Sequence, residues 1–213
     1  MSMFRTTLIS AALGTALLLA PSAHAAEVAY TLDPGHTQVD FRWSHLGLST
    51  PAASFDQVEG TLKWDAQHPT RSSVTVTMPL AGLDTRVPAL DEHLRAPDFF
   101  DAARHPNVTF RSTSVERGKK VGEFRIHGIL TVKDTSRPVV LDARLNGAKD
   151  HPMMKVPAVG FDAPTRIKRS DFGLGAVVPM VSDAINIRIT TEAIEATGYA
   201  RAMEAMSKAA AGK

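Results

Sequence analysis

Apolar and polar residues alternate along one segment of this chain after another, and this alternation constrains the fold more than any other feature. A period of two places every second side chain on the same face of a β-strand, so each segment predicts a strand with one apolar and one wet face. The segments that show it are residues 39–43, 58–64, 73–78, 108–115, 121–126, 129–132, 137–145, 159–167 and 184–193. We therefore expect an all-β fold of eight or nine strands.

Short runs of turn-forming residues separate these strands. They include Asp33-Pro34-Gly35, Arg117-Gly118 and Asn146-Gly147. Many antiparallel strands with one apolar face form either a sandwich or an up-and-down barrel. Closing the sheet into a barrel removes its exposed edges, and about eight strands leave an interior that can hold one ligand.

Residues 88–103 interrupt the strands with a helical pattern. Leu90 and Leu94 are one helical turn apart, so they lie on the same face, and Phe99 and Phe100 follow as an aromatic pair. We predict a short helical lid inserted over one end of the β-structure, with aromatic side chains pointing into it.

The N-terminus has the pattern of a cleaved signal peptide. Arg5 precedes an apolar run at residues 8–20, and Ala23 and Ala25 are the small residues that a signal peptidase reads. The alternative is a membrane anchor, but the thirteen residues of this run fall short of the roughly 20 that a spanning helix needs. We predict that residues 1–25 are removed and that the protein is periplasmic.

The remaining chain divides into one domain and a tail. Residues 26–196 suffice for one apolar core, and no linker divides them. Residues 197–213 are rich in alanine and methionine, which favour a helix. Because isolated helices of this length are marginal in water, we expect a poorly ordered tail rather than a helix.

Composition and spacing exclude several functions. The chain has no cysteine, so disulfides and thiolate chemistry are excluded. Its formal net charge of +2 at pH 7 does not indicate nucleic-acid binding. Two Tyr and two Trp cannot form the girdles of an outer-membrane barrel, and no segment after the signal peptide could span a membrane as a helix. The eight histidines lack metal-site spacing and no serine lies in a GxSxG sequence, so we expect no metal, no cofactor and no catalytic residue.

Basic side chains gather at residues 166–169, shortly before Asp171. One interpretation is a solvated strand edge at which Arg169 pairs with Asp171. The other is a cationic rim that holds a phosphate or another polar head group by charge-assisted hydrogen bonds.

Several motifs resemble those of YceI-like proteins and occur in that family's order. They are residues 33–41 and 45–47, 91–95 with 97–101, 105–112, 128–132, 169–173 and 181–183. The resemblance covers residues 30–196, nearly the whole predicted domain. It implies a lipocalin-like antiparallel barrel, typically periplasmic, that holds a polyisoprenoid lipid in an elongated apolar tunnel. Ligands of the family include isoprenoid quinones and polyprenyl phosphates, some members respond to stress, and no catalysis is established for the family as a whole.

A linear isoprenoid has no hydrogen-bonding groups along its chain, so its site should be a dry tube of aliphatic and aromatic side chains. The candidate ligand-binding residues are Phe41, Trp43, Phe55, Leu83, His93, Phe99, Phe100, Phe110, Phe161, Arg169 and Phe172. The alternative is that the apolar ones simply fill the barrel as core.

Two functional hypotheses follow. The first is a lipid carrier that is not an enzyme. The second is an enzyme acting on a lipid or lipid-linked substrate, with polar groups near the lid such as Asp91, His93 or Arg169. The sequence leaves the oligomeric state open, with a homodimer as one alternative.

Overall fold

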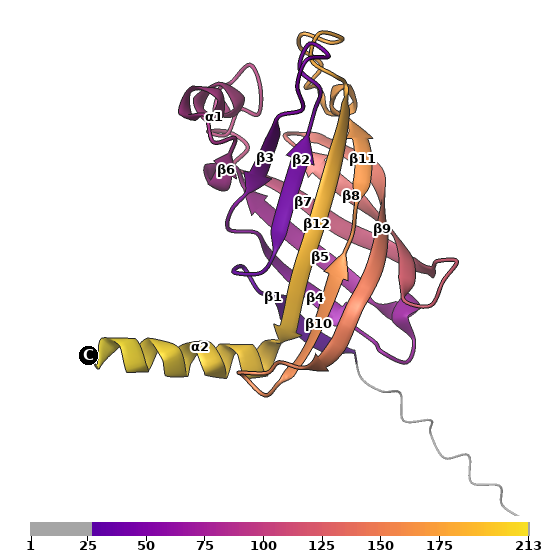
Figure 1. The fold of residues 1–213 in the computed structure, drawn as a ribbon, viewed down its shortest axis with the longest axis vertical. Coiled ribbons are helices and arrows are strands. Elements are labelled where there is room, and N and C mark those ends of the chain that lie inside the picture. The colour runs from indigo at the N-terminus through magenta and orange to yellow at the C-terminus, as the bar shows by residue number, and fades with distance from the viewer. Residues whose placement is uncertain (1–26, 213) are drawn as a thin grey trace, which may run out of the picture.

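The computed structural model describes residues 27–212, and the predicted signal peptide lies outside them. The chain forms an elongated antiparallel β-barrel with one helix near each end (Figure 1). Within residues 27–212, no helix has both the length and the apolar character needed to cross a membrane.

Twelve strands form one sheet that closes on itself. They are β1 (Val28–Leu32), β2 (Gln38–Arg42), β3 (Ala52–Phe55), β4 (Glu59–Trp64), β5 (Ser73–Pro79), β6 (Leu83–Asp84), β7 (Asn107–Arg117), β8 (Glu123–Val132), β9 (Thr135–Asp150), β10 (Pro157–Asp162), β11 (Thr165–Lys168) and β12 (Ala184–Glu195). The order of pairing is β1-β4-β5-β7-β8-β9-β10-β12, and β12 pairs again with β1, where Tyr30 is opposite Glu195. This last pairing closes the barrel.

Eight positions around the barrel accommodate the twelve strands, because four pairs of short strands are each one interrupted strand. β1 continues as β2 beyond a turn, and both pair with β12. β3 and β4 belong together in the same way, as do β5 with β6 and β10 with β11. The predicted single barrel of about eight antiparallel strands is therefore confirmed, and the sandwich is excluded.

Three strand boundaries differ from the prediction. The predicted strands 121–126 and 129–132 are one strand, β8, which begins only at Glu123 and runs through Gly128, where the lack of a side chain leaves space for a neighbouring ring. Asn146-Gly147 is no turn: β9 runs through it, and Asn146 is a bulge at which the register with β10 shifts. Residues 159–167 divide into β10 and β11 at Ala163, whose N–H donates to the Ile189 carbonyl at 2.9 Å.

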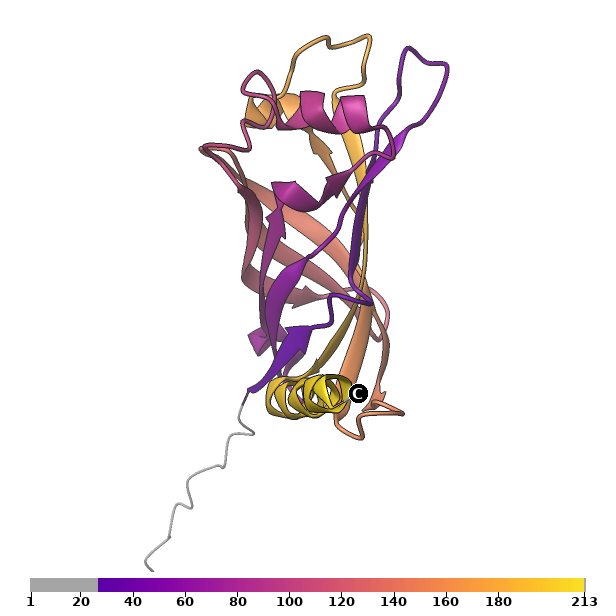
Figure 2. The same cartoon turned by 90° about the vertical axis from the view of Figure 1, so that its left-hand side faces the viewer.

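Helix α1 (Pro88–Arg95) lies across one end of the barrel, as the lid prediction required (Figure 2). Helix α2 (Ala196–Ala211) begins at the opposite end and extends away from the wall (Figure 1). The poorly ordered tail that we expected is thus a helix. Its first turn is fixed because the Glu195 carboxylate accepts hydrogen bonds from the N–H groups of Thr197 at 3.0 Å and Gly198 at 2.7 Å.

Gly128 provides a test of how tightly the wall is packed. A Cβ atom at this position would lie 2.3 Å from Phe110 Cζ, so alanine must displace a ring that faces the cavity. We expect Gly128→Ala to lower the free energy of unfolding by about 1–3 kcal/mol, measured by chemical denaturation.

Gly147→Ala is the matched control, since a Cβ there meets no atom within 4 Å. It should change the free energy of unfolding by less than about 0.5 kcal/mol. Equal losses in both variants would contradict the assigned packing of Phe110.

Candidate functional site

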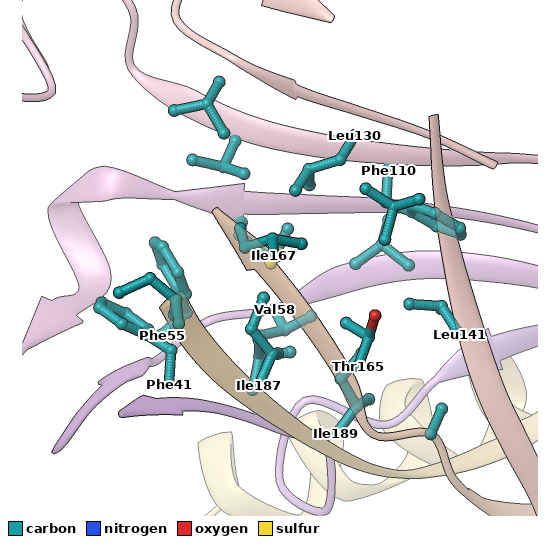
Figure 3. A pocket seen from close by; sticks show the side chains of 18 of the residues that line it. Phe41, Phe55, Val58, Phe110, Leu130, Leu141, Thr165, Ile167, Ile187 and Ile189 are labelled. Atoms are coloured by element: carbon teal, nitrogen blue, oxygen red, sulfur yellow. The ribbon is translucent and has the colours of Figure 1, made fainter. Parts of the chain in front are cut away.

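A cavity of about 600 Å³ runs along the interior of the barrel. Figure 3 shows how its walls face one another: Ile187 and Ile189 of β12 lie across from Phe110 of β7 and Leu130 of β8. Because apolar and polar residues alternate along the strands, the apolar side chain at every second position points into this space. Barrel closure leaves the space hollow, because the inner side chains do not reach across it.

Several hydroxyl groups in the lining bond the wall itself. The Thr165 hydroxyl, the red atom in Figure 3, donates to the Val140 carbonyl at 2.8 Å. The hydroxyls of Thr37 and Thr191 bond each other at 2.7 Å. The middle of the cavity therefore offers a ligand almost no hydrogen-bonding partner.

Ten of the eleven candidate residues line this cavity. They are Phe41, Trp43, Phe55, His93, Phe99, Phe100, Phe110, Phe161, Arg169 and Phe172. Leu83 does not: it lies in β6, is only 1% exposed and packs within the wall's core. The position of Leu83 depends on the tertiary structure, because β6 is only two residues long and follows a 3-10 turn that the sequence pattern did not indicate.

Aromatic side chains mark the two ends of the cavity. At the α1 end, the Phe41 ring lies 5.6 Å from Phe55 and 5.9 Å from Trp43 between ring centroids. At the α2 end, Trp64 makes edge-to-face contacts with Phe161 at 5.4 Å and Phe124 at 6.0 Å. Trp64 and Phe124 were not among our candidates, although Trp64 stands on the apolar face of its alternating segment.

The cavity reaches solvent at the α1 end. Only four of its lining residues are exposed: His45, Val87, His93 and Val177. Val87 is the residue before α1, and His93 lies on α1 beside Phe99, with ring centroids 6.0 Å apart. The mouth of the cavity therefore lies between the lid and the neighbouring loops.

Hydrogen bonds hold the lid to the barrel wall. The Asp91 carboxylate accepts from the Thr85 N–H at 2.7 Å and from the Thr85 hydroxyl at 2.6 Å. These bonds, the hydroxyl's first, hold the pKa of Asp91 below its usual value. Arg95 donates through Nε to the Leu80 carbonyl at 3.0 Å and also bonds the Leu83 carbonyl. Both ends of α1 are thus attached to the segment before it.

Arg169 fits neither interpretation of the basic cluster. Its side chain is buried, and its guanidinium donates to the carbonyls of Ala176 at 2.8 Å and Val181 and Ser182 at 3.0 Å, as well as Leu174. Burial lowers its pKa from the ordinary value. No ion pair with Asp171 occurs among the described residues. Arg169 holds the loop before β12, and few of its donors remain for a head group.

One group of side chains outside the cavity has ligand atoms close enough to hold a metal ion. These atoms, from Asp33, His36 and Glu192, lie within 4.8 Å of one another. The Asp33 carboxylate is already engaged, by His36 Nδ1 at 2.6 Å and by the Gly35 N–H at 3.0 Å. The arrangement is that of a hydrogen-bonded turn between β1 and β2.

The Asp91 bonds predict a pH-dependent lid. Because the folded pKa is lowered, these bonds stabilise the lid fully above the unfolded value, about 3.9 for Asp, and are lost as the pH falls through the lower folded value. At neutral pH we expect Asp91→Ala to speed amide hydrogen exchange in residues 85–95 severalfold.

The neighbouring exposed carboxylate provides the control. Glu92→Ala should leave exchange in residues 85–95 unchanged at neutral pH. In the parent protein, exchange corrected for its intrinsic pH dependence should increase only at strongly acidic pH. An unaltered rate in Asp91→Ala would contradict the role given to this carboxylate.

The sequence of this chain matches a known protein family. Residues 30–193 match the sequence profile of the YceI-like domain. The chain is 35% identical over 194 residues to the UPF0312 protein of Azotobacter vinelandii, covering 90% of this chain and 99% of that one. It is 33% identical over 191 residues to protein YceI of Escherichia coli O157:H7, covering 90% and 98%.

Solved structures share the fold. The YceI protein of Campylobacter jejuni matches with a TM-score of 0.62 and 28% identity, covering 71% of this chain and 89% of that one. BcnA of Burkholderia cenocepacia matches with a TM-score of 0.68 and 20% identity, covering 76% and 98%. A polyisoprenoid-binding domain of Saccharophagus degradans matches with a TM-score of 0.57 and 14% identity, covering 79% and 99%. At these last two identities the likeness is one of fold.

Proposed function

Since the chain belongs to the YceI-like family, we propose that it is a carrier that binds one long polyisoprenoid lipid, an isoprenoid quinone or a polyprenyl phosphate, inside its barrel. The observation that carries this proposal is the apolar cavity, in which the hydroxyl groups of Thr37, Thr165 and Thr191 bond the wall. The Saccharophagus degradans domain, which shares the fold and is described as polyisoprenoid-binding, supports the same ligand class.

The energetics favour such a ligand. The cavity volume of about 600 Å³ lies within the usual range for small-molecule sites. Each methylene group removed from water contributes about 0.8 kcal/mol. A chain of several isoprene units therefore gains enough to offset the loss of its own freedom on binding. A sugar or a nucleotide would lose its hydrogen bonds to water and find none in the cavity.

The position of the mouth orients the ligand. The closed aromatic end at Trp64 suits the end of an isoprenoid tail, and the exposed end offers His45 and His93 to a polar head group. Arg169 is a weaker candidate for head-group binding, because the loop carbonyls already use most of its donors. The tail would thus enter first and the head group would remain near the lid.

A periplasmic carrier accounts for the sequence as well as the cavity. A lipid of this kind needs a protein to cross an aqueous compartment, and the signal-peptide pattern of residues 1–25 is the basis for placing the protein in the periplasm. A role in the stress response rests on the family resemblance alone. A homodimer remains an untested alternative.

An enzyme is the second candidate, and the lid geometry makes it the weaker one. Of the three polar groups near the mouth, Asp91 is bonded to Thr85 and Arg169 to loop carbonyls. No hydrogen bond among the described residues links His93 to either of them. Acid–base catalysis needs groups within hydrogen-bond reach of one another or of the substrate.

Mass spectrometry of the lipid that co-purifies from the native host tests the proposal. We expect an intact isoprenoid at close to one molecule per protein, unchanged after incubation. A product that accumulates on incubation, and that is lost in His93→Ala, would establish the enzyme instead. Protein that carries no isoprenoid at all would contradict the carrier.

Filling the cavity should displace the ligand. Ile187 faces the middle of the cavity in Figure 3, so Ile187→Trp should remove most of the bound lipid while the protein stays folded. The bound amount is measured after extraction. The control is Asn186→Trp, which places the same ring on the exposed outer face of β12 and should leave lipid binding intact. Equal binding in both variants would place the ligand elsewhere.

A further inference from the structure

Two loops extend beyond the lid at the mouth of the cavity. One comprises residues 43–51, between β2 and β3, and the other residues 173–183, before β12. Both reach further along the long axis of the barrel than α1 does (Figures 1 and 2). They are joined by hydrogen bonds, since the Leu46 N–H donates to the Met180 carbonyl at 2.8 Å and the Ser182 N–H to the Ser44 carbonyl at 2.9 Å. The two loops therefore form one structural unit.

This unit exposes large apolar side chains to solvent. We use the name tip surface for Leu46, Leu48, Val177, Val178 and Met180 of these loops, together with Val87 just before α1. The surface holds six of the eleven large apolar side chains that are exposed in residues 27–212, and Leu48 is 85% exposed. Scattered exposed apolar residues need no explanation, but a cluster of this kind marks an interaction site.

The two loops of the tip surface also carry almost no charge. Residues 43–55 and residues 172–182 contain no Asp, Glu, Lys or Arg, although charged residues make up 22% of the chain. Loops kept in water would be expected to carry several charged side chains. Asp183, the last residue of the second loop, is the one charged residue of the two loops, and its carboxylate accepts hydrogen bonds from Ser170. This near absence of charge favours a partner that is itself apolar below its surface.

A buried cation holds one of these loops in place. Arg169 donates to the carbonyls of Ala176, Val181 and Ser182, all of which belong to the loop at residues 173–183. A buried guanidinium is costly unless its donors are paired, so the loop cannot leave Arg169 without loss. The apolar side chains of the loop are therefore presented on a fixed support.

The tip surface is continuous with the cavity. Val87 and Val177 belong to both: each lines the cavity and each is more than half exposed. An apolar surface at the opening of an apolar tube has one evident partner of matching chemistry, the acyl layer of a membrane. A ligand that leaves the tube there would move from protein to hydrocarbon without crossing water.

We propose that the tip surface inserts into the surface of a lipid bilayer and places the mouth of the cavity against the membrane. This inference rests on the proposed carrier function, because it names the surface with which the carrier exchanges its lipid. Insertion is shallow and reversible, since six side chains bury far less apolar area than a spanning helix does.

Flotation with vesicles of phosphatidylethanolamine and phosphatidylglycerol tests the proposal. We expect the parent protein to float with the vesicles, and the double variant Leu48→Asp with Met180→Asp to lose most of this binding. The control is Val121→Asp with Met153→Asp, which adds the same charges to exposed apolar residues in the turns after β7 and β9. Because both variants share the same N-terminus, a difference between them reports on the tip surface.

Site-specific fluorescence provides a second measurement. The chain has no cysteine, so Leu48→Cys and Val121→Cys can each be labelled at one position with an environment-sensitive dye. Adding vesicles should shift the emission to shorter wavelength at position 48 and leave position 121 unchanged. A protein that does not float, or that floats equally in both double variants with no shift at position 48, overturns the proposal.

The two proposals fail in different ways. Lipid extracted from the tip variant should equal that of the parent, because no residue that it changes lines the cavity. If the parent protein carries lipid but does not bind vesicles, the carrier function is supported and insertion of the tip surface is contradicted. If the parent protein binds vesicles through the tip surface but carries no lipid, insertion is supported and the carrier function is contradicted.

Discussion

Closure of the sheet through β12 is the constraint on which the rest of this structure depends. One strand pairs with β1 and β2 on one side and with β10 and β11 on the other, so no open edge remains around the wall. At roughly 24 cal/mol for each Å³ of cavity, an empty space of about 600 Å³ would cost on the order of 10 kcal/mol, close to the net stability of a domain. The wall must therefore resist collapse, and a bound apolar ligand would relieve this cost.

The two ends of the barrel serve different purposes. At the α2 end, Trp64, Phe124 and Phe161 pack edge to face and close the cavity. At the α1 end, Asp91 and Arg95 attach the lid to the preceding segment, and the exposed lining residues gather between the lid and the loops. The cavity is thus closed by aromatic packing at one end and reaches solvent at the other, beside a lid that hydrogen bonds hold in place.

Two charged groups near the mouth hold parts of the structure in place. Asp91 and Arg169 are the two charged groups that sequence reasoning placed near a ligand, and both use their hydrogen bonds on the protein's own backbone or hydroxyls. The Arg169 hydrogen bonds fix the loop at residues 173–183 at the mouth. The lid region thus combines a hydrogen-bonded frame with an exposed apolar surface.

Much of this protein is determined by its sequence alone. The period of two identifies the wall strands and their inner faces, since it is a local property of the backbone. The spacing of Leu90 and Leu94 and the Phe99–Phe100 pair identify the lid, and ten of the eleven candidate residues line the cavity. These features follow from neighbours in the sequence, so they can be read before the fold is known.

Only the tertiary structure decides whether the inner side chains meet or leave a space, because that depends on strand number and closure. The tertiary structure also explains the glycine at position 128, because the Phe110 ring of the neighbouring strand occupies the space that a side chain there would fill. Asn146-Gly147 stays within β9 because Asn146 forms a bulge, with Gly147 opposite Gly160 and Leu145 opposite Phe161 of β10. Arg169 is a loop anchor because distant carbonyls surround it, and α2 forms because Glu195 caps it. Each of these outcomes depends on contacts or strand pairings that the sequence pattern by itself does not specify.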